Sequence, residues 1–414
     1  MLPGQPRILL IAPAQSYRIG AYVDAARALG MAVEIASPGR HSLMRELAQG
    51  PQIDLHDPLR SLDSIAFAAR STPYVGIIPT DDATLELAAQ AAARLGLSYN
   101  SVRSARLARR KDLARECLRQ AGVPVPQHRV ISLVRDPASQ IDDFTFPCVV
   151  KPLSLSASRG VIRANDPAQF VAACARIQPI IADQPDPFES SHLLAEAYIE
   201  GEEVALEGFL SHGLLRVLAL FDKPEPLRGP FFEETYYITP SRLSWAIQRR
   251  IHARVADACA AYGLIEGPVH AELRIAGGEA WILEVAGRTI GGECGSIFSL
   301  ASSQSIEALV VASAVGRPPP AVGIEGAAGV LMIPIPKPGM LRRCDGVAEA
   351  SRVRHIQAVR ISAPPGHELV TLPEGSSYLG FIFSRAETAA QAEAALREAH
   401  GKLSFKIDPV WHLN

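Results

Sequence analysis

The sequence predicts a mixed α/β and α+β protein that opens with a doubly wound parallel-sheet domain. Two short apolar strands, at residues 7–12 and 31–36, flank a segment at 19–29 whose apolar residues have helical spacing. This strand–helix–strand order is typical of a parallel sheet covered by helices. A further apolar strand at 74–79 extends the pattern. Residues 1–105 are therefore expected to form one small N-terminal domain.

Chain length and composition limit what the rest of the chain can be. Its 414 residues are 48% hydrophobic and 20% charged, which is ordinary for a globular protein. Such a length suggests roughly two to four units with their own cores. The formal net charge of −2 gives no electrostatic reason to expect a nucleic acid or an anionic membrane as partner. No apolar run approaches the roughly 20 residues of a membrane-spanning helix.

Targeting signals and paired cysteines are also absent from the sequence pattern. Residues 1–7 lack the basic-then-apolar order of a signal peptide. The six cysteines are scattered without a CxxC pair, which indicates reduced thiols. We therefore expect a cytoplasmic enzyme with no nucleic-acid or membrane partner. The sequence leaves open whether it forms a homodimer.

The remainder of the chain alternates helices and strands in an α+β order. A Gly-Arg-Pro-Pro-Pro run at 316–320 is its clearest linker. We expect a central α+β region at 106–318 with two subdomains, the first being a lid at about 124–199, and a C-terminal α+β subdomain at 319–414. The expected elements are helices at 106–120, 166–176, 249–262, 305–315 and 387–400, hairpins at 203–210/214–221 and 269–275/279–285, and strands at 330–335 and 378–384.

A lysine at the end of a strand is the first candidate for nucleotide chemistry. The sequence has neither G-x-G-x-x-G after its first strand nor G-x-x-x-x-G-K-[ST] anywhere, so a phosphate site must be built in another way. Lys151 ends the apolar run Cys148–Pro152 and can place its ammonium over a phosphate. Lys111, at the start of a helical segment, offers a second phosphate-binding cation.

The loop after Lys151 consists of small residues, among them Ser156, Ser158 and Gly160. Its backbone N–H groups can surround terminal phosphates, and the loop can close as a lid. The alternative is an exposed loop next to an incidental lysine.

An apolar strand that breaks at a polar hinge is the second candidate. The run Leu194–Glu203 passes through Glu196, Ala197 and Ile199 before an acidic turn. Backbone groups and one carboxylate at such a hinge can hydrogen-bond the edge of an adenine, and Glu203 can accept hydrogen bonds from ribose hydroxyls. The alternative is an acidic turn between two strands.

Two carboxylates inside otherwise apolar strands give the strongest signal. If 269–275 and 279–285 pair as a hairpin, Glu272 and Glu284 lie opposite one another on the same face. Inward carboxylates are costly unless they hold a cation. Mg²⁺, bound by one or two carboxylates plus substrate phosphates, is the natural occupant, with Mn²⁺ as an alternative. We therefore expect a metal site at Glu272 and Glu284.

Arg288 follows the second of these strands and is a candidate for substrate binding. Its guanidinium can neutralise a carboxylate substrate or the phosphoryl group in transfer. Gly291 and Gly292 come directly afterwards, and their lack of side chains would let a bound carboxylate approach the backbone. The alternative is that Arg288 pairs with Glu284 or Glu272.

Two further segments contain candidate substrate contacts. Residues 221–236 are Pro-rich and mix aromatic with acidic side chains, and long loops of that kind are often functional. Glu233 or Glu234 can hold a substrate ammonium, although a surface excursion is the alternative. His270 shares a strand face with Glu272, so it is either a substrate contact or a core histidine with satisfied partners.

The order and spacing of these motifs resemble the ATP-grasp superfamily. Within it, the chain is similar to bacilysin-type L-amino acid ligases and to biotin-carboxylase-like proteins, and residues 378–384 resemble the last subdomain of that branch. The resemblance implies an ATP-grasp fold of two α+β subdomains at 106–318, preceded by a pre-ATP-grasp domain. The matching positions are Lys111, Lys151 with its small-residue loop, the Glu196 hinge with Glu203, Glu272 and Glu284.

The resemblance also implies roles for the candidate residues. Lys111 and Lys151 would contact the phosphates of ATP. Glu196 and the backbone of 197–199 would bind adenine, and Glu203 would bind the ribose. The metals, Mg²⁺ or Mn²⁺, would be held by Glu272 and Glu284. Arg288 would act at the reacting carboxylate, and Lys151 would also be catalytic because it offsets the charge that develops during phosphoryl transfer.

Two departures from family patterns bear on the reaction. Many ATP-grasp enzymes have Glu-x-Asn at the second metal carboxylate, whereas Glu284 is followed by Val285 and Ala286. One metal ligand is therefore absent or comes from elsewhere, and the amino acid ligases share an alanine there. Biotin carboxylases have Gln-Val-Glu after the arginine, where this chain has Ile290-Gly291-Gly292. This difference argues against bicarbonate as the substrate.

The resemblance thus implies an ADP-forming carboxylate–amine ligase that makes an amide or a dipeptide through an acyl phosphate. Its expected substrates are ATP and small-molecule carboxylates and amines, with amino acids foremost. One alternative is a biotin-carboxylase-like enzyme that carboxylates a small molecule. The other is a nucleotide-binding regulator with little catalytic activity.

Overall fold

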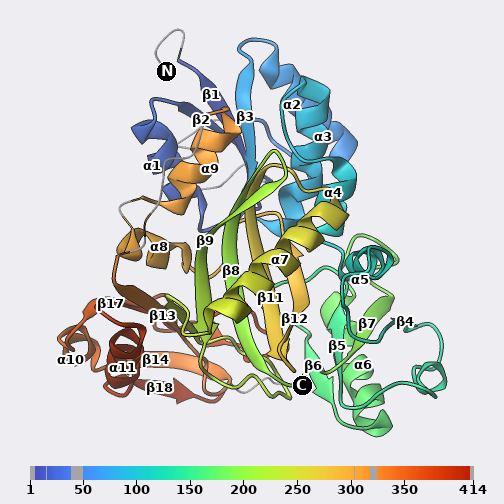
Figure 1. Ribbon diagram of the computed structural model, residues 1–414, viewed down its shortest axis with the longest axis vertical. Helices are drawn as coiled ribbons and strands as arrows, with labels where there is room; N and C mark the ends of the chain where they lie inside the picture. Colours follow the sequence, from blue (N-terminus) through green and yellow to red (C-terminus); the bar gives the residue numbers. More distant parts are fainter. Residues whose placement is uncertain are drawn as a thin grey trace.

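The computed structural model describes residues 5–14, 16–38, 50–302, 304–317, 323 and 325–410. In Figure 1 a long central sheet runs through the molecule. The N-terminal strands lie at the top, a lid lies at the lower right, and the C-terminal elements lie at the lower left. In chain order the elements are β1 (Arg7–Ile11), α1 (Ile19–Ala28), β2 (Ala32–Ala36), α2 (Pro58–Ala69), β3 (Tyr74–Pro79), the 3-10 turn η2 (Asp82–Thr84), α3 (Leu85–Leu95), α4 (Val102–Leu107), α5 (Lys111–Gln120), β4 (His128–Ser132), η3 (Ala138–Gln140), β5 (Cys148–Pro152), β6 (Ile162–Ala164), α6 (Pro167–Ile181), β7 (His192–Ala197), β8 (Glu202–Ser211), β9 (Leu214–Lys223), β10 (Tyr236–Thr239), α7 (Trp245–Tyr262), β11 (Gly267–Ala276), β12 (Glu279–Ala286), α8 (Gly295–Ala301), α9 (Ile306–Ala314), β13 (Ala327–Ile333), β14 (Gly339–Asp345), α10 (Val347–Ser351), β15 (Ile356–Ile361), β16 (Glu368–Leu369), β17 (Gly380–Ala386), α11 (Ala389–His400) and β18 (Ser404–Asp408).

The N-terminal sheet has the strand order β2-β1-β3, and both of its pairings are parallel. Alternate residues of β1 point to opposite faces, and both faces are buried. Ile8 and Leu10 pack into a core with α1 and α9, whereas Leu9 and Ile11 pack with α2 and α3. The predicted doubly wound sheet is confirmed. One of its covering helices, α9, comes from much later in the chain.

The central sheet has eight strands in the order β12-β11-β8-β9-β10-β13-β17-β15. Both predicted hairpins, β8–β9 and β11–β12, are present in it as antiparallel pairs. Helix α7 lies diagonally across this sheet (Figure 1). It begins after Ser244, whose side chain accepts from the Ile247 N–H, and it ends at Gly263, which has the positive φ of 73° that favours glycine.

The lid is a four-stranded antiparallel sheet in the order β4-β7-β5-β6. Helix α6 packs on it through a separate apolar core that includes Phe170 and Ile177. Asp166 caps the start of this helix by accepting from the Gln169 N–H, and Pro167 occupies its first turn. The lid therefore has its own core and meets the central sheet along one side.

The C-terminal part extends the central sheet and adds a small sheet of its own. Strands β13, β17 and β15 continue the eight-stranded sheet under α11, and β16-β14-β18 form the small one. The predicted strands at 330–335 and 378–384 and the final helix are confirmed. Part of the predicted linker, Pro318–Pro320, lies outside the described residues. The division into 1–105, 106–318 and 319–414 stays a prediction, since one continuous sheet serves the last two.

Three helix predictions need correction. The single helix expected at 106–120 is two helices, α4 and α5, because Arg110 between them is extended, with φ −93° and ψ 102°. Helix α6 runs five residues beyond the predicted end at 176, and α7 begins at Trp245 instead of residue 249.

Among the described helices no single one is long and apolar enough to cross a membrane. Only α8 and α9 together, with a bend of 103° between them, reach that length and composition.

Candidate active site

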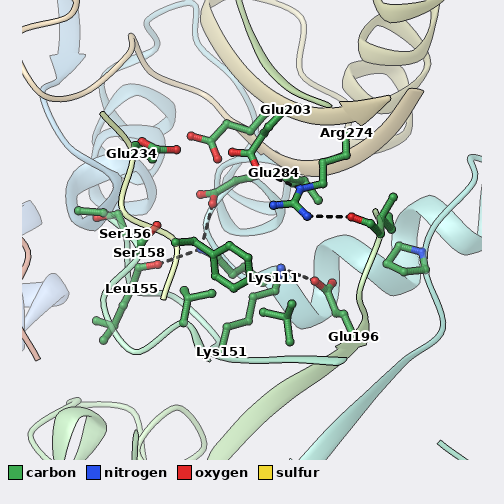
Figure 2. Close-up of a pocket in the computed structure, with 18 of the residues that line it drawn as sticks. Lys111, Lys151, Leu155, Ser156, Ser158, Glu196, Glu203, Glu234, Arg274 and Glu284 are labelled. Atoms are coloured by element: carbon green, nitrogen blue, oxygen red, sulfur yellow. Dashed lines mark hydrogen bonds and ion pairs between the residues drawn. The ribbon is translucent and has the colours of Figure 1, made fainter. Parts of the chain in front are cut away.

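A cleft of about 970 Å³, including space open to solvent, lies between the lid and the central sheet. Figure 2 shows side chains from both sides of it pointing toward one another. The cleft is lined by most of the residues singled out from the sequence: Lys111, Lys151, Ser156, Ser158, Glu196, Ala197, Ile199, Glu203, Glu234, His270, Glu272, Glu284 and Arg288. Gly160, Glu233, Gly291 and Gly292 are not part of its lining.

Lys111 connects the lid loop to the carboxylates of the central sheet. It is the first residue of α5, and its N–H donates to the Leu153 carbonyl at 2.9 Å. Its ammonium donates to the Leu155 carbonyl at 2.9 Å and lies 3.2 Å from Glu284 Oε2. The break between α4 and α5 makes Lys111 the start of a helix directed at this loop. An ammonium in this position can bind an anion in the cleft.

Lys151 is buried, and its ammonium forms an ion pair with Glu196 Oε2. The other oxygen of Glu196 accepts from Arg115, whose guanidinium also donates to the Leu283 carbonyl at 2.7 Å. Burial alone would raise the pKa of Glu196, but the two cations outweigh it and lower this pKa to about 2. Glu196 is therefore a fixed anion that holds Lys151 at the cleft wall.

Lys151→Ala should weaken nucleotide binding roughly tenfold to a hundredfold, because a lost charge-assisted hydrogen bond typically costs about 1.5–3 kcal/mol. The fold should tolerate the change, since Glu196 keeps its partner Arg115. Calorimetric titration with ADP measures the first effect, and the thermal midpoint measures the second. Arg129→Ala is the control, because Arg129 lies in the same lid sheet and pairs with the exposed Asp143. If wild type and Lys151→Ala bind ADP with equal affinity, Lys151 does not contact the nucleotide and has a structural role only.

The hinge between β7 and β8 presents backbone groups to the cleft. The N–H groups of Ala197 and Tyr198 donate to the carbonyls of Gln127 and Pro147, at 2.8 and 2.9 Å. No described residue accepts from the Ile199 N–H, although Ile199 lines the cleft. One backbone donor is thus available at the position where an adenine edge was predicted to bind.

Three carboxylates surround a buried lysine on the central sheet. Glu203, Glu234 and Glu272 each have an oxygen within 4.8 Å of the others. The Lys223 ammonium lies 2.9 Å from Glu203 and 3.6 Å from Glu272, and it also pairs with Glu234. Glu234 accepts a further hydrogen bond from the Tyr237 hydroxyl at 2.8 Å. Burial and the nearby Glu272 raise the pKa of Glu234, although Lys223 opposes them.

The predicted pair Glu272 and Glu284 has the expected register, because the two residues lie directly opposite each other in β11 and β12. Their side chains are 23% and 25% exposed, whereas that of Glu203 is 7% exposed. Carboxylate oxygens that reach the cleft fit the donor preference of Mg²⁺. The donor set therefore suits a divalent cation bound at Glu272 and Glu284 beside substrate phosphates.

His270 is a buried residue with partners on both ring nitrogens. Nδ1 lies 3.1 Å from Glu207 and Nε2 lies 3.4 Å from Glu272. Burial lowers the pKa of His270, but its two carboxylate partners raise it to about 9. The fully buried Glu207 also accepts from the Ile290 N–H at 3.1 Å. His270 therefore has the satisfied partners expected of a core histidine. It also lines the cleft, as a substrate contact would.

Arg288 pairs with neither Glu284 nor Glu272, the two partners considered from the sequence. Its Nη2 lies 2.7 Å from Asp82 Oδ2, in the N-terminal domain. Burial would raise the pKa of Asp82, but the Arg288 guanidinium outweighs it, and the pKa lies below its ordinary value. Asp82 is the first residue of the turn η2, which closely follows β3. Its position is therefore set by the N-terminal sheet. The N-terminal domain thereby positions Arg288 at the cleft.

The predicted residues outside the lining make contacts of other kinds. The Gly160 N–H donates to the Pro373 carbonyl of the C-terminal part at 2.9 Å, so it faces away from the cleft. Glu233 accepts from the Ile335 N–H at 3.3 Å. The Gly292 N–H donates to the Tyr17 hydroxyl at 2.7 Å, and a Cβ on Gly292 would lie 2.8 Å from Met332 Sδ.

Several residues of the site were missed by sequence reasoning. Asp82 lies in a short turn after β3, and Arg115 lies in the middle of α5. A signal did exist for two others, because Lys223 and Arg274 are cations within mainly apolar strands, where a charge requires a partner. Both are less than a tenth exposed and bind Glu203.

Two family models match parts of this chain. Residues 144–297 match the family model described as an ATP-grasp domain. This part of the chain is similar to an ATP-grasp domain, and the resemblance inferred from the sequence is confirmed. Residues 331–408 match a second model, the L-amino acid ligase C-terminal domain 2. The C-terminal part of the chain is therefore similar to that of the L-amino acid ligases.

Comparisons with individual proteins agree with these matches. The chain is 28% identical over 220 residues to alanine–anticapsin ligase of Bacillus subtilis, which covers 49% of this chain and 46% of that protein. It is 27% identical over 172 residues to a D-alanine–D-alanine ligase of Paracidovorax citrulli, covering 40% of this chain and 49% of that protein. The chain thus spans about half the length of the curated relatives it matches.

A solved structure matches over almost the whole chain. The L-amino acid ligase from Bacillus licheniformis superposes with a TM-score of 0.83 at 23% identity, over 98% of this chain and 99% of that chain. A likeness at this level of identity shows a shared fold.

Proposed function

We propose that this chain is an ATP-dependent, ADP-forming carboxylate–amine ligase, and within that class an L-amino acid ligase. The single observation that carries the proposal is the composition of the cleft. It brings two lysines, a hinge with an available N–H, opposed carboxylates and a positioned arginine into one cavity. The match of the C-terminal part to an L-amino acid ligase domain supports the narrower class.

In the proposed reaction the cleft binds ATP with its base at the hinge and its phosphates toward Lys111 and Lys151. Mg²⁺ held by Glu272 and Glu284 would supply charge neutralisation for the phosphates. Arg288 binds the carboxylate that accepts the γ-phosphoryl group, which gives an acyl phosphate and ADP. The amine of the second substrate then attacks the acyl carbon, phosphate leaves, and an amide forms.

In this scheme the lid also protects the acyl phosphate from water. An acyl phosphate is hydrolysed when water reaches it, so the cleft must exclude water until the amine arrives. The 153–160 loop forms part of the cleft wall, with Ser156 and Ser158 in its lining. We infer that this loop covers the phosphates and the acyl phosphate during turnover.

The direct test is release of ADP and phosphate from the full chain with Mg²⁺-ATP, screened over single L-amino acids and their pairs. Release that requires two amino acids, with a dipeptide detected by mass spectrometry, is the expected result. If ADP and phosphate are released only with bicarbonate and a single acceptor molecule, the enzyme is a carboxylase and not a ligase of amino acids. Nucleotide binding without turnover under any condition would make the chain a nucleotide-binding regulator.

A further inference from the structure

Arg274 lies at the centre of the nucleotide end of the cleft, on β11 (Figure 2). It is 3% exposed, and each of its nitrogens has a separate acceptor. Nε donates to Glu203 Oε2 at 3.0 Å, Nη1 donates to the Ile199 carbonyl at 2.8 Å, and Nη2 donates to the Leu227 carbonyl at 2.6 Å. One guanidinium therefore joins the acidic end of β8, the hinge, and the segment between β9 and β10.

The surroundings of Arg274 fix its plane as well as its hydrogen bonds. Its guanidinium carbon lies 4.8 Å from the ring centre of Tyr198 and 5.5 Å from that of Phe232. Tyr198 follows β7 at the hinge, and its ring is also approached by Arg163 of the lid strand β6, at 4.2 Å. Since Arg274 and Glu203 are direct partners across β11 and β8, the guanidinium sits on the rigid central sheet.

We propose that Arg274 is a positioning residue for the nucleotide: it orients the Ile199 peptide toward the base and the Glu203 carboxylate toward the ribose. This inference rests on the proposed function, because it assumes that a nucleotide occupies the hinge. The Ile199 carbonyl shares its peptide plane with the Glu200 N–H. The hydrogen bond from Nη1 fixes that plane and, through the Ile199 Cα, limits how the preceding Tyr198–Ile199 peptide can turn. The Ile199 N–H itself has no acceptor among the described residues.

Glu203 retains capacity for a ligand although both of its oxygens are engaged. Oε1 accepts from Lys223 at 2.9 Å and Oε2 accepts from Arg274. An ionised carboxylate has about four acceptor sites, so it can take further hydrogen bonds from ribose hydroxyls. Without the guanidinium, Glu203 keeps its hydrogen bond from Lys223 but loses the contact that fixes its second oxygen.

The test measures nucleotide selectivity in Arg274→Lys, because a structural residue would affect all nucleotides alike. Calorimetry on the full chain compares ADP with 2′-deoxy-ADP, which lacks one ribose hydroxyl, and with IDP. The hypoxanthine base of IDP carries a proton on N1, where adenine has an acceptor. An ammonium cannot make three divergent hydrogen bonds in the plane of a guanidinium. We expect ADP affinity to fall roughly tenfold or more, and the preference over both analogues to shrink at least about threefold.

Arg254→Lys is the matched control, since Arg254 forms a structural ion pair with Glu279 at the far end of the β11–β12 hairpin, at 3.2 Å. It should leave both preferences unchanged. If Arg274→Lys does not fold, Arg274→Met replaces it, because an unbranched apolar chain can pack against the same two rings and Glu203 keeps Lys223. An equal loss of affinity for all three nucleotides would overturn the positioning role. A wild-type chain that binds none of them would instead overturn the proposed function.

Discussion

Arg288→Lys should retain ADP affinity and lose most ligation. Arg288 is the one cation in the described cleft wall that is held by the N-terminal domain, through Asp82 at 2.7 Å. A guanidinium can grip a carboxylate with two parallel hydrogen bonds, whereas an ammonium is a point charge. Removing a fixed donor from a developing anion typically costs about 10²- to 10³-fold in kcat. We expect a loss of that order in dipeptide formation, measured by mass spectrometry.

The control for this variant is Arg360→Lys. Arg360 forms an exposed ion pair with Glu293, on the same loop as Gly292, and such surface pairs contribute little. It should keep both ligation and ADP affinity. Ligation by Arg288→Lys at the wild-type rate would remove Arg288 from the reacting carboxylate and leave it a structural partner of Asp82.

Glu284→Gln should abolish most ADP formation while the protein stays folded. Glu284 is opposite Glu272, is about as exposed to the cleft, and contacts the Lys111 ammonium at 3.2 Å. An amide oxygen is a weaker ligand for Mg²⁺ than a carboxylate, and metal stabilisation of transferring phosphoryl charge contributes several kcal/mol. A loss of at least about a hundredfold in kcat follows from about 2.7 kcal/mol. The measurement is ADP release as a function of Mg²⁺ concentration.

Glu279→Gln is the control, because Glu279 begins the same strand but pairs with Arg250 and Arg254 outside the cleft. Its turnover and Mg²⁺ dependence should match the wild type. If Glu284→Gln turns over more slowly but needs the same Mg²⁺ concentration, Glu284 acts through Lys111 and is not a metal ligand.

Features that depend on short-range order could be predicted from the sequence. Glu272 and Glu284 were placed opposite each other because alternation along a strand and a short turn fix the register of a hairpin. The same local logic located the break in the chain that follows Glu196, between β7 and β8, and the lysine near the end of β5. In each case the relevant residues are on one strand or on two neighbouring strands.

Contacts between distant segments could not be predicted in this way. Asp82 meets Arg288 because the start of α3 lies near the end of β12, where a Cβ on Gly287 would be 4.0 Å from Leu85. No pattern near either residue encodes that packing. Gly160 belongs to the lid loop by sequence, yet its N–H is taken by Pro373 of the C-terminal part. The break between α4 and α5 has no glycine or proline to mark it. It is imposed by contacts such as the bond from the Lys111 N–H to Leu153.

Transfer of an oxygen atom tests the central claim most directly. If a substrate carboxylate is phosphorylated and an amine then displaces phosphate, one carboxylate oxygen leaves with that phosphate. Ligation is run with ATP and an amino acid labelled with ¹⁸O in the carboxylate that is activated, and the released phosphate is examined by mass spectrometry. The acyl phosphate route predicts one ¹⁸O atom in each phosphate formed with product. Unlabelled phosphate, released while labelled product still accumulates, would contradict the route and with it the role given to Arg288.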